Sequence, residues 1–172
     1  MISADWPVKK TRRLGLLLFT LDGVNLGLQL MVGSRSADLA TAALLADADA
    51  QAVVCPADIR DRGSIRSAVE AAVAALGPLR GAIANAGVGG PNSAGDDDRW
   101  DDLIQTNLSG TYHTARAAQP HLAATGIRHL VFTSSVLGRF GVPGYTGYCA
   151  AKTGIIGLAR ALSMEVSGEG VQ

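Results

Sequence analysis

The sequence predicts a single α/β domain in which helices cover both faces of a doubly wound parallel sheet. Short apolar runs alternate along the chain with longer segments of helical period, which is typical of this class. The chain has 172 residues, of which 48% are hydrophobic and 17% charged, so it can enclose one core but not two ordinary domains. We expect one domain over residues 1–172, with 1–13 as a flexible N-terminal segment.

Five short apolar runs are expected to form the strands of this sheet. Each is bounded by polar or turn-forming residues, as buried parallel strands usually are. Ligands of such sheets bind beyond the carboxyl ends of the strands, which is where polar residues of this chain collect. The predicted strands are 14–20, 30–34, 52–55, 79–85 and 129–135.

The clearest helix lies between the third and fourth predicted strands. Asp61 or Ser64 can cap its start, and Gly77 followed by proline stops it. Two further helices are expected over 100–122 and 148–166. The first helix is recognised by apolar residues at helical spacing, namely Ile65, Val69, Val73 and Leu76.

Charge and cysteine content favour small-molecule chemistry in the cytoplasm. Fifteen basic residues balance fifteen acidic ones, so no overall field attracts nucleic acid or an anionic membrane. Cys55 and Cys149 are isolated and have no metal-ligand spacing to a histidine, which predicts reduced thiols and no metal site. Basic residues before the run 14–21 resemble a secretion signal, but Asp22 and Asn25 soon interrupt it, so a buried first strand is favoured.

Tyr148 and Lys152 are the strongest candidate for chemistry. In a helix their spacing of four places phenol and ammonium on one face, where the cation can stabilise a phenolate. Tyrosine alone loses its proton near pH ~10, so it needs such a neighbour to exchange protons near neutrality. Ser135, thirteen residues before Tyr148, adds a hydroxyl that can bind a substrate carbonyl. The alternatives are an ordinary surface contact for the pair and a loop-satisfying hydroxyl for Ser135.

Three other polar positions are weaker signals when taken alone. Asn107 lies inside a predicted helix, so it is either exposed or its amide is used, for example to hold a water against the lysine. The segment 85–87 combines an asparagine with a glycine that permits close backbone approach, or else forms an ordinary turn. Asp58 at another strand end either accepts from a ligand amine or caps a turn.

Together these residues resemble the short-chain dehydrogenase/reductase family. Its SxxG, YxxxK, NAG, mid-chain Asn and strand-end Asp motifs match in family order, and the match is best over residues 50–172. The matching positions are Ser135 to Gly138, Tyr148 to Lys152, Asn85 to Gly87, Asn107 and Asp58. The resemblance implies a Rossmann-like fold and an NAD(P)-dependent oxidoreductase that interconverts a secondary alcohol and a ketone.

The resemblance also implies roles for the catalytic residues. Tyr148 would donate or accept the proton, and Lys152 would lower the pKa of the tyrosine and hold the nicotinamide ribose. Ser135 would orient the substrate oxygen, and Asn107 would maintain a proton relay. The helices that carry Asn107 and Tyr148 resemble those that build family homodimers and homotetramers.

Cofactor contacts are implied in the same way. Asp58 and Ile59 would face the adenine, while Asn85, Ala86 and Gly87 would line the cofactor cleft. Gly27 is the one glycine retained from the family's phosphate loop. Arg35 follows the predicted second strand without an acid before it, which favours NADP over NAD by accommodating a 2′-phosphate.

The chain departs from the family pattern between Thr20 and Arg35. Leu21 and Asn25 stand where the phosphate loop has glycines, and too few residues follow Gly27 for a crossover helix and a strand. The chain also stops after its last predicted helix, so it is expected to be incomplete relative to the family. The alternative function is therefore a catalytically inactive truncated relative that acts as a binding or interaction protein.

Overall fold

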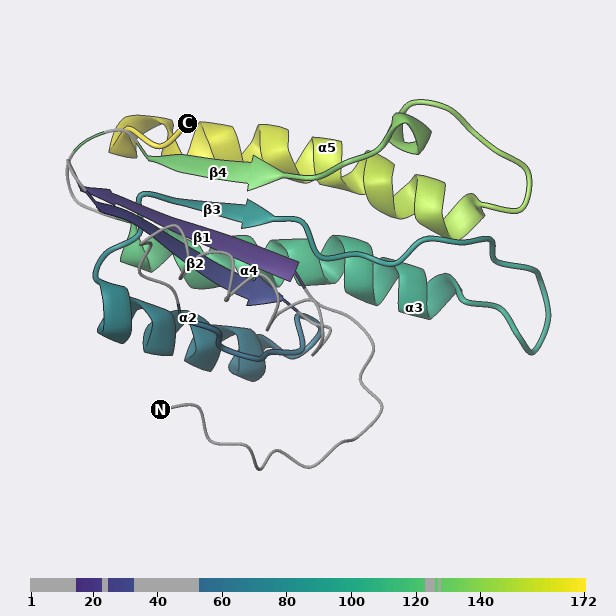
Figure 1. The fold of residues 1–172 in the computed structure, drawn as a ribbon. Coiled ribbons are helices and arrows are strands. Elements are labelled where there is room, and N and C mark those ends of the chain that lie inside the picture. Colours follow the sequence, from purple (N-terminus) through teal and green to yellow (C-terminus); the bar gives the residue numbers. More distant parts are fainter. Residues whose placement is uncertain (1–14, 23–24, 33–52, 123–125, 127) are drawn as a thin grey trace, which may run out of the picture.

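The computed structural model describes residues 15–22, 25–32, 53–122, 126 and 128–172, with the backbone alone described for the first two ranges. The expected N-terminal segment 1–13 and Arg35 lie outside the described residues. Figure 1 shows how the strands and α-helices of the described residues are arranged. They are β1 (Gly15–Asp22), β2 (Asn25–Val32), α2 (Arg62–Leu76), β3 (Gly81–Ala84), α3 (Trp100–Ile104), α4 (Gly110–Ala118), β4 (His129–Phe132) and α5 (Thr146–Val166).

The four strands form one mixed sheet in the order β2-β1-β3-β4 (Figure 1). β3 and β4 are parallel and are joined through α3 and α4, which is the βαβ unit expected of the α/β class. β1 is antiparallel to both of its neighbours, so the prediction of a parallel sheet is wrong for the first two strands. The α/β class itself is confirmed.

The second predicted strand, 30–34, begins earlier than expected because β1 and β2 form a hairpin. Asp22 pairs with Asn25, and the register then runs back to Gly15 opposite Val32. A hairpin needs only a short connection, whereas a parallel crossover needs about a dozen residues or more. The short stretch of chain after β1 is thus consistent with antiparallel pairing.

The third predicted strand, 52–55, is also wrong over the residues that are described. Val53 to Cys55 pair with no described strand, although Val53 and Cys55 pack in the core. Cys55 belongs to the buried core cluster and Val53 packs against it, so their burial does not depend on a strand ladder. The core cluster comprises Cys55, Ala57, Ile59, Ile65, Ala68, Val69, Ala72, Leu79, Ala82, Ala86 and Ala118.

α2 has the start and the stop that the sequence predicts. Asp61 is the N-cap, and its carboxylate accepts hydrogen bonds from the backbone N–H groups of Gly63 and Ser64 at 2.8 and 3.3 Å. Gly77 ends the helix at φ 89°, a left-handed conformation that glycine adopts without a Cβ penalty. The buried face of α2 includes Ile65 and Val69 and packs on α4.

The long helical stretch predicted over 100–122 is present but is not regular. A π-helical segment, Gln105–Ser109, separates α3 from α4, and a 3₁₀ turn, Gln119–His121, follows. α4 packs on β3, whereas α3 packs on α5. The irregular segment therefore lies between the sheet-packed half and the α5-packed half of the stretch.

α5 runs beside β4 and ends close to where that strand begins (Figure 1). The chain then returns to the sheet, because Gln172 accepts from the N–H of Leu130 at 2.9 Å and donates to the C=O of Arg128 at 2.8 Å. A parallel bridge joins Arg128 and Val171. β4 is thus hydrogen-bonded on both sides at its first residues. None of the described helices has the length and apolarity needed to cross a bilayer.

Candidate functional site

The predicted catalytic residues gather at the carboxyl ends of β3 and β4, together with the segment 85–87. Asn85 to Gly87 directly follow β3, and Thr133 to Ser135 directly follow β4. Because the two strands are parallel, both segments leave the sheet at the same edge. The first turns of α5 pass this edge and bring Tyr148 and Lys152 to it.

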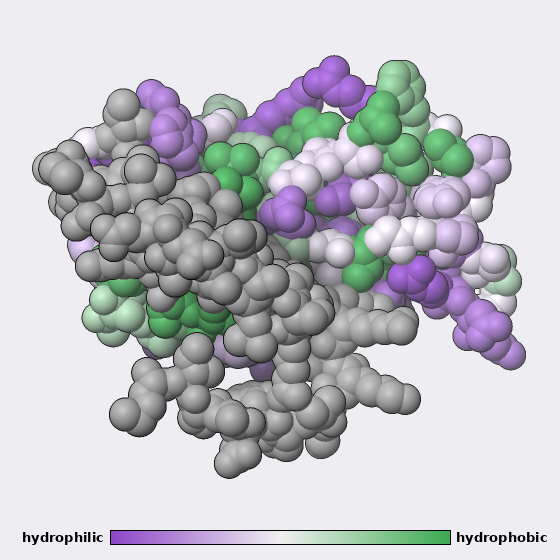
Figure 2. Space-filling model, viewed as in Figure 1, coloured by the Kyte–Doolittle hydropathy of each residue, from purple (hydrophilic) through white to green (hydrophobic). Residues whose placement is uncertain are grey.

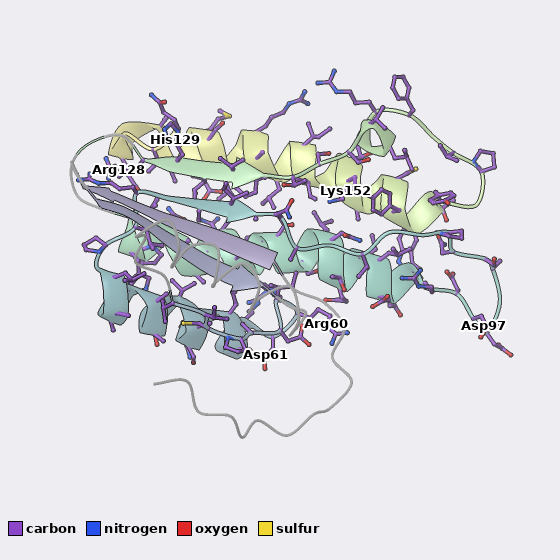
Figure 3. All side chains as sticks on the ribbon, in the orientation of Figure 1. Arg60, Asp61, Asp97, Arg128, His129 and Lys152 are labelled. Carbon is purple, nitrogen blue, oxygen red and sulfur yellow. The ribbon has the colours of Figure 1, made fainter. Side chains whose placement is uncertain are left out.

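The side chain of Lys152 extends from α5 toward the segments that follow β3 and β4 (Figure 3). Its side chain is 4% exposed, and Nζ donates to the Thr133 carbonyl at 2.8 Å. Nζ also lies 5.7 Å from the centre of the Tyr148 ring. Burial away from water disfavours the ammonium and lowers the pKa of Lys152. The predicted Tyr–Lys proximity is therefore present.

Tyr148 is half-buried in the first turn of α5. A cation within 6 Å of a ring centre is attracted by the electrons of the ring. The ammonium and the phenol are therefore neighbours on one face of α5. The prediction that Tyr148 transfers a proton is taken up below.

Asn107 is fully buried within the π-helical segment, so its alternative as an exposed helix position is wrong. Its Oδ1 accepts from the N–H of Val88 at 2.9 Å, and its Nδ2 donates to the carbonyls of Val88 and Leu103 at 3.0 and 2.9 Å. The amide thus fastens the segment after β3 to the helix.

Gly87 permits a close approach at the same place. A Cβ at this position would lie 2.5 Å from Oδ1 of Asn107 and 3.6 Å from Nζ of Lys152. The first distance is shorter than real Cβ contacts, so any side chain would displace the amide. The predicted close backbone approach at residues 85–87 is therefore found, and it joins Asn107 and Lys152 in one site. Asn85 is exposed beside it, and Ala86 is buried in the core.

Ser135 is in extended conformation and caps a 3₁₀ turn, Val136–Gly138. Its Oγ accepts from the N–H of Leu137 at 3.2 Å, which is the loop-satisfying interpretation. Accepting leaves the proton of the hydroxyl available to a substrate oxygen, so the two interpretations are compatible. The neighbouring Ser134 donates to the main-chain carbonyl of Lys152 at 2.7 Å and ties this segment to α5.

Hydrophobic side chains reach the surface on the loop that joins β4 to α5, at the upper right of Figure 2. Val136 and Phe140 are more than half exposed, and Val142 is 38% exposed. This loop connects Ser135 to Tyr148 along the chain. The segment between these two predicted site residues therefore exposes several apolar side chains.

Asp58 and Ile59 precede α2 and are followed directly by Arg60 and Asp61, which are labelled in Figure 3. The Asp58 carboxylate accepts from the backbone N–H, Nε and an Nη of Arg60, and these hydrogen bonds raise the pKa of the arginine. The Ile59 side chain is buried against Gly110. An open cavity of about 510 Å³ adjoins the carboxylate and is lined by Asp58, Arg60, Asp61, Asp101, Asp102 and Gln105.

Sequence reasoning missed two buried polar residues that hold these segments. His113 on α4 lies 2.9 Å from the Ile59 carbonyl through Nδ1, and its Nε2 accepts from Nε of Arg62 at 3.0 Å. Asn92, after β3, bonds to the start of α5. A histidine in a helical apolar pattern was the available signal for the first, while Asn92 sits in an unpatterned loop.

Gly27 is not found at a turn that opens a helix. It lies within β2 and pairs with Thr20 of β1. Its backbone is part of an antiparallel ladder, so it does not stand at a helix N-terminus that would face a phosphate. Arg35 lies outside the described residues.

The parallel βαβ unit, with a Tyr–Lys pair and a buried asparagine at its carboxyl edge, defines the class of protein. The family model for short chain dehydrogenases matches residues 21–172. An uncharacterized oxidoreductase of Mycobacterium tuberculosis is 38% identical over 145 residues, covering 81% of this chain and 53% of the relative. The (-)-trans-carveol dehydrogenase of Rhodococcus erythropolis is 41% identical over 122 residues, covering 68% and 44%.

A solved structure agrees with these relatives. The crystal structure of carveol dehydrogenase from Mycobacterium avium in complex with NAD has a TM-score of 0.77 and 37% identity, over 81% of this chain and 52% of that one. The chain therefore belongs to the short-chain dehydrogenase family and shares its Rossmann fold. It spans about half the length of the curated relatives it matches.

Proposed function

We propose that this chain belongs to an NAD(P)-dependent oxidoreductase that interconverts a secondary alcohol and a ketone. One observation carries the proposal: the buried Lys152 lies against Tyr148 at the edge where β3 and β4 end. A buried lysine beside a tyrosine is the pairing that makes a phenol a usable acid and base. Family membership supports the reaction class.

The residues at this edge fit the nicotinamide end of a dinucleotide. Gly87 lacks the side chain that would fill the space beside Lys152, and Asn85 next to it is exposed. Lys152 would hold the ribose, and Asn85 to Gly87 would line the cleft. When bound, the nicotinamide supplies or accepts the hydride of the reaction. At the other end, Gly27 in β2 does not provide the expected phosphate turn.

In the direction of reduction, Tyr148 donates its phenolic proton to the carbonyl oxygen of the substrate. Lys152 stabilises the phenolate that remains, and the Ser135 hydroxyl donates a hydrogen bond to the same substrate oxygen. Asn107 hydrogen-bonds the backbone of Val88 and so fixes the position of the segment beside Lys152. We propose that Asn107 supports a proton relay in this way. In oxidation the same groups act in reverse.

The cofactor is proposed to be NADP, with NAD as the alternative. Arg35 supports NADP because a guanidinium can donate two hydrogen bonds to the oxygens of a 2′-phosphate. The related Mycobacterium avium structure holds NAD, which supports the alternative. The substrate is proposed to be a small alcohol or ketone, and the apolar loop of Val136, Phe140 and Val142 is consistent with an apolar one.

A catalytically inactive binding protein is the second candidate. The observation in its favour is the β1–β2 hairpin, since a hairpin provides no helix N-terminus for a pyrophosphate. The two candidates differ in cofactor binding and in turnover.

Cofactor titration tests both candidates on the same preparation. Nicotinamide fluorescence is followed as NADPH or NADH is added, and ketone reduction is then assayed. We expect saturable binding, weaker for NADPH in Arg35→Ala, and reduction that falls at least about 100-fold in Tyr148→Phe with binding retained, since acid–base catalysis contributes about that much. No binding at millimolar cofactor favours the inactive candidate, and full reduction by Tyr148→Phe would refute the proton donor.

A further inference from the structure

The start of α5 is held by a side chain from a different part of the sequence. The first N–H groups of a helix have no partner within the helix and are usually satisfied by the N-cap side chain. At α5 the N-cap is Tyr145, whose side chain makes no cap hydrogen bond. The Asn92 amide takes this place, because its Oδ1 accepts from the N–H of Gly147 at 2.8 Å.

Asn92 is 9% exposed, and both ends of its amide are engaged. Nδ2 donates to a carboxylate oxygen of Asp98 at 3.0 Å, and the Thr146 hydroxyl lies 3.0 Å from Nδ2 and 3.2 Å from Oδ1. The orientation of the amide is determined by its partners, since an N–H must meet the oxygen and a carboxylate must meet the nitrogen. Asn92 thus links α5 to Asp98 by hydrogen bonds that require an acceptor on one side and a donor on the other.

Two further contacts make the junction tight. The backbone N–H of Asn92 donates to the Gly144 carbonyl at 2.8 Å, just before α5. The same Asp98 oxygen also accepts from the N–H of Trp100, the first residue of α3. A Cβ at Gly147 would lie 3.3 Å from Oδ1 of Asn92 and 3.1 Å from Leu103, so the lack of a side chain there permits the approach. The starts of α3 and α5 are therefore linked through one amide.

We propose that Asn92 is a positioning residue for Tyr148, and the inference rests on the proposed oxidoreductase function. Tyr148 directly follows Gly147, whose N–H is the group that Asn92 holds. The amide acts on the first turn of α5 and thereby sets where the phenol lies relative to Ser135 and Lys152. Asn92 itself contacts neither substrate nor cofactor in this role.

Exchanging the two polar partners tests the role. Asn92→Asp places two carboxylates together and is expected to lower kcat about 10- to 100-fold with little change in KM, as small misplacements of reacting groups do. The double variant Asn92→Asp with Asp98→Asn restores a donor facing an acceptor, and also keeps acceptors for Gly147 and Trp100. It is expected to recover most of kcat. Ser93→Asp, an exposed neighbour, is the matched charge control and keeps full activity.

Hydrogen exchange gives a readout that needs no turnover. Asn92→Ala removes the acceptor, so exchange of the Gly147 amide is expected to speed up about tenfold, the usual size of a lost cap, with amides in α2 unchanged. Unchanged Gly147 exchange, or failure of the double variant to recover kcat, overturns the proposal. The kcat criterion applies only if the wild type turns over; faster Gly147 exchange in Asn92→Ala with a wild type that shows no turnover supports the anchor and refutes the oxidoreductase function. If Asn92→Ala does not fold, the kcat of the double variant Asn92→Asp with Asp98→Asn decides whether the proposal holds.

Discussion

Lys152 illustrates how one residue serves the site at a cost to the fold. Its ammonium has left water almost completely and has the Thr133 carbonyl as its hydrogen-bond acceptor. Burying a charge with incomplete compensation is unfavourable, which is why its pKa falls. The same burial places the ammonium against the Tyr148 ring. The burial that makes the charge unfavourable for stability is therefore also what the proposed function requires.

The free energy of unfolding is expected to depend on pH because of the buried Lys152. Unfolded Lys152 titrates near its ordinary pKa of 10.5, and folded Lys152 titrates lower. Between these values the unfolded chain holds more protons, so stability rises with pH in that window, whereas below it the burial cost is fully present. Relative to wild type, Lys152→Met is therefore expected to be most stabilised at pH 7 and to lose that advantage as pH approaches 10.5.

Urea unfolding between pH 7 and 10.5 measures this difference. Arg160→Met, an exposed position on the same helix, is the control and should differ from wild type by a constant amount. A Lys152→Met difference that does not change with pH would contradict the assignment of the low pKa to burial. The Met variant should in either case lack ketone reduction, because the phenolate has lost its cation.

At the scale of elements, α2 is the clearest case of a helix with local start and stop signals. Asp61 accepts two backbone N–H groups, and Gly77 takes the left-handed conformation at the other end. Both interactions lie within a few residues of the helix, which is why the sequence predicts them. The helix then packs Ile65 and Val69 into the core beneath the segment that carries Asp58.

Asp61→Ala is expected to lower the free energy of unfolding by about 1 kcal/mol, the usual contribution of an N-cap side chain. Asp61→Asn should retain most of it, because the amide oxygen accepts the same hydrogen bonds. Urea denaturation of the three proteins gives the comparison. An equal loss for Asn and Ala would mean that the charge of Asp61, rather than its capping geometry, is what matters.

At the scale of the whole molecule, α5 is placed between the site and the surface. Its inner side carries Lys152 and Ile155, whereas Met164 is 80% exposed. A salt bridge between Arg116 and Glu165 joins α4 to α5 at 2.7 Å, but both partners are substantially exposed, and such pairs contribute little stability. Met164 is the most exposed large apolar side chain among the described residues, and the family resemblance predicts that α5 lies in a homodimer or homotetramer interface.

We expect the chain to form homodimers or homotetramers through this surface. Light scattering of the wild type should give at least twice the 17.7 kDa mass of one chain, and Met164→Glu should shift the population toward that single-chain mass. Ala74→Glu, an exposed position on α2, is the control for added charge. A wild type of 17.7 kDa at all concentrations would show that α5 does not mediate assembly.

The parts of this protein that depend on near neighbours along the chain can be predicted from its amino-acid sequence. Helical spacing marks the buried face of α2, Asp61 and Gly77 mark its ends, and Tyr148 and Lys152 share a face of α5 because they lie one turn apart. Asn107, Ser135 and Tyr148 were joined in one hypothesis by the family resemblance of their motifs, each of which spans only a few residues. These features follow from interactions across a few residues of chain.

Strand direction, the burial of Lys152 and the cap on α5 depend instead on contacts between distant parts of the chain. The hairpin of β1 and β2 replaces the expected parallel pair, since pairing partners are chosen by contacts across the whole sheet. Asn92 reaches Gly147 across 55 residues, and Asn107 reaches Val88 across 19. Such contacts leave no periodic pattern, because each needs one polar side chain at one place that only the folded chain creates.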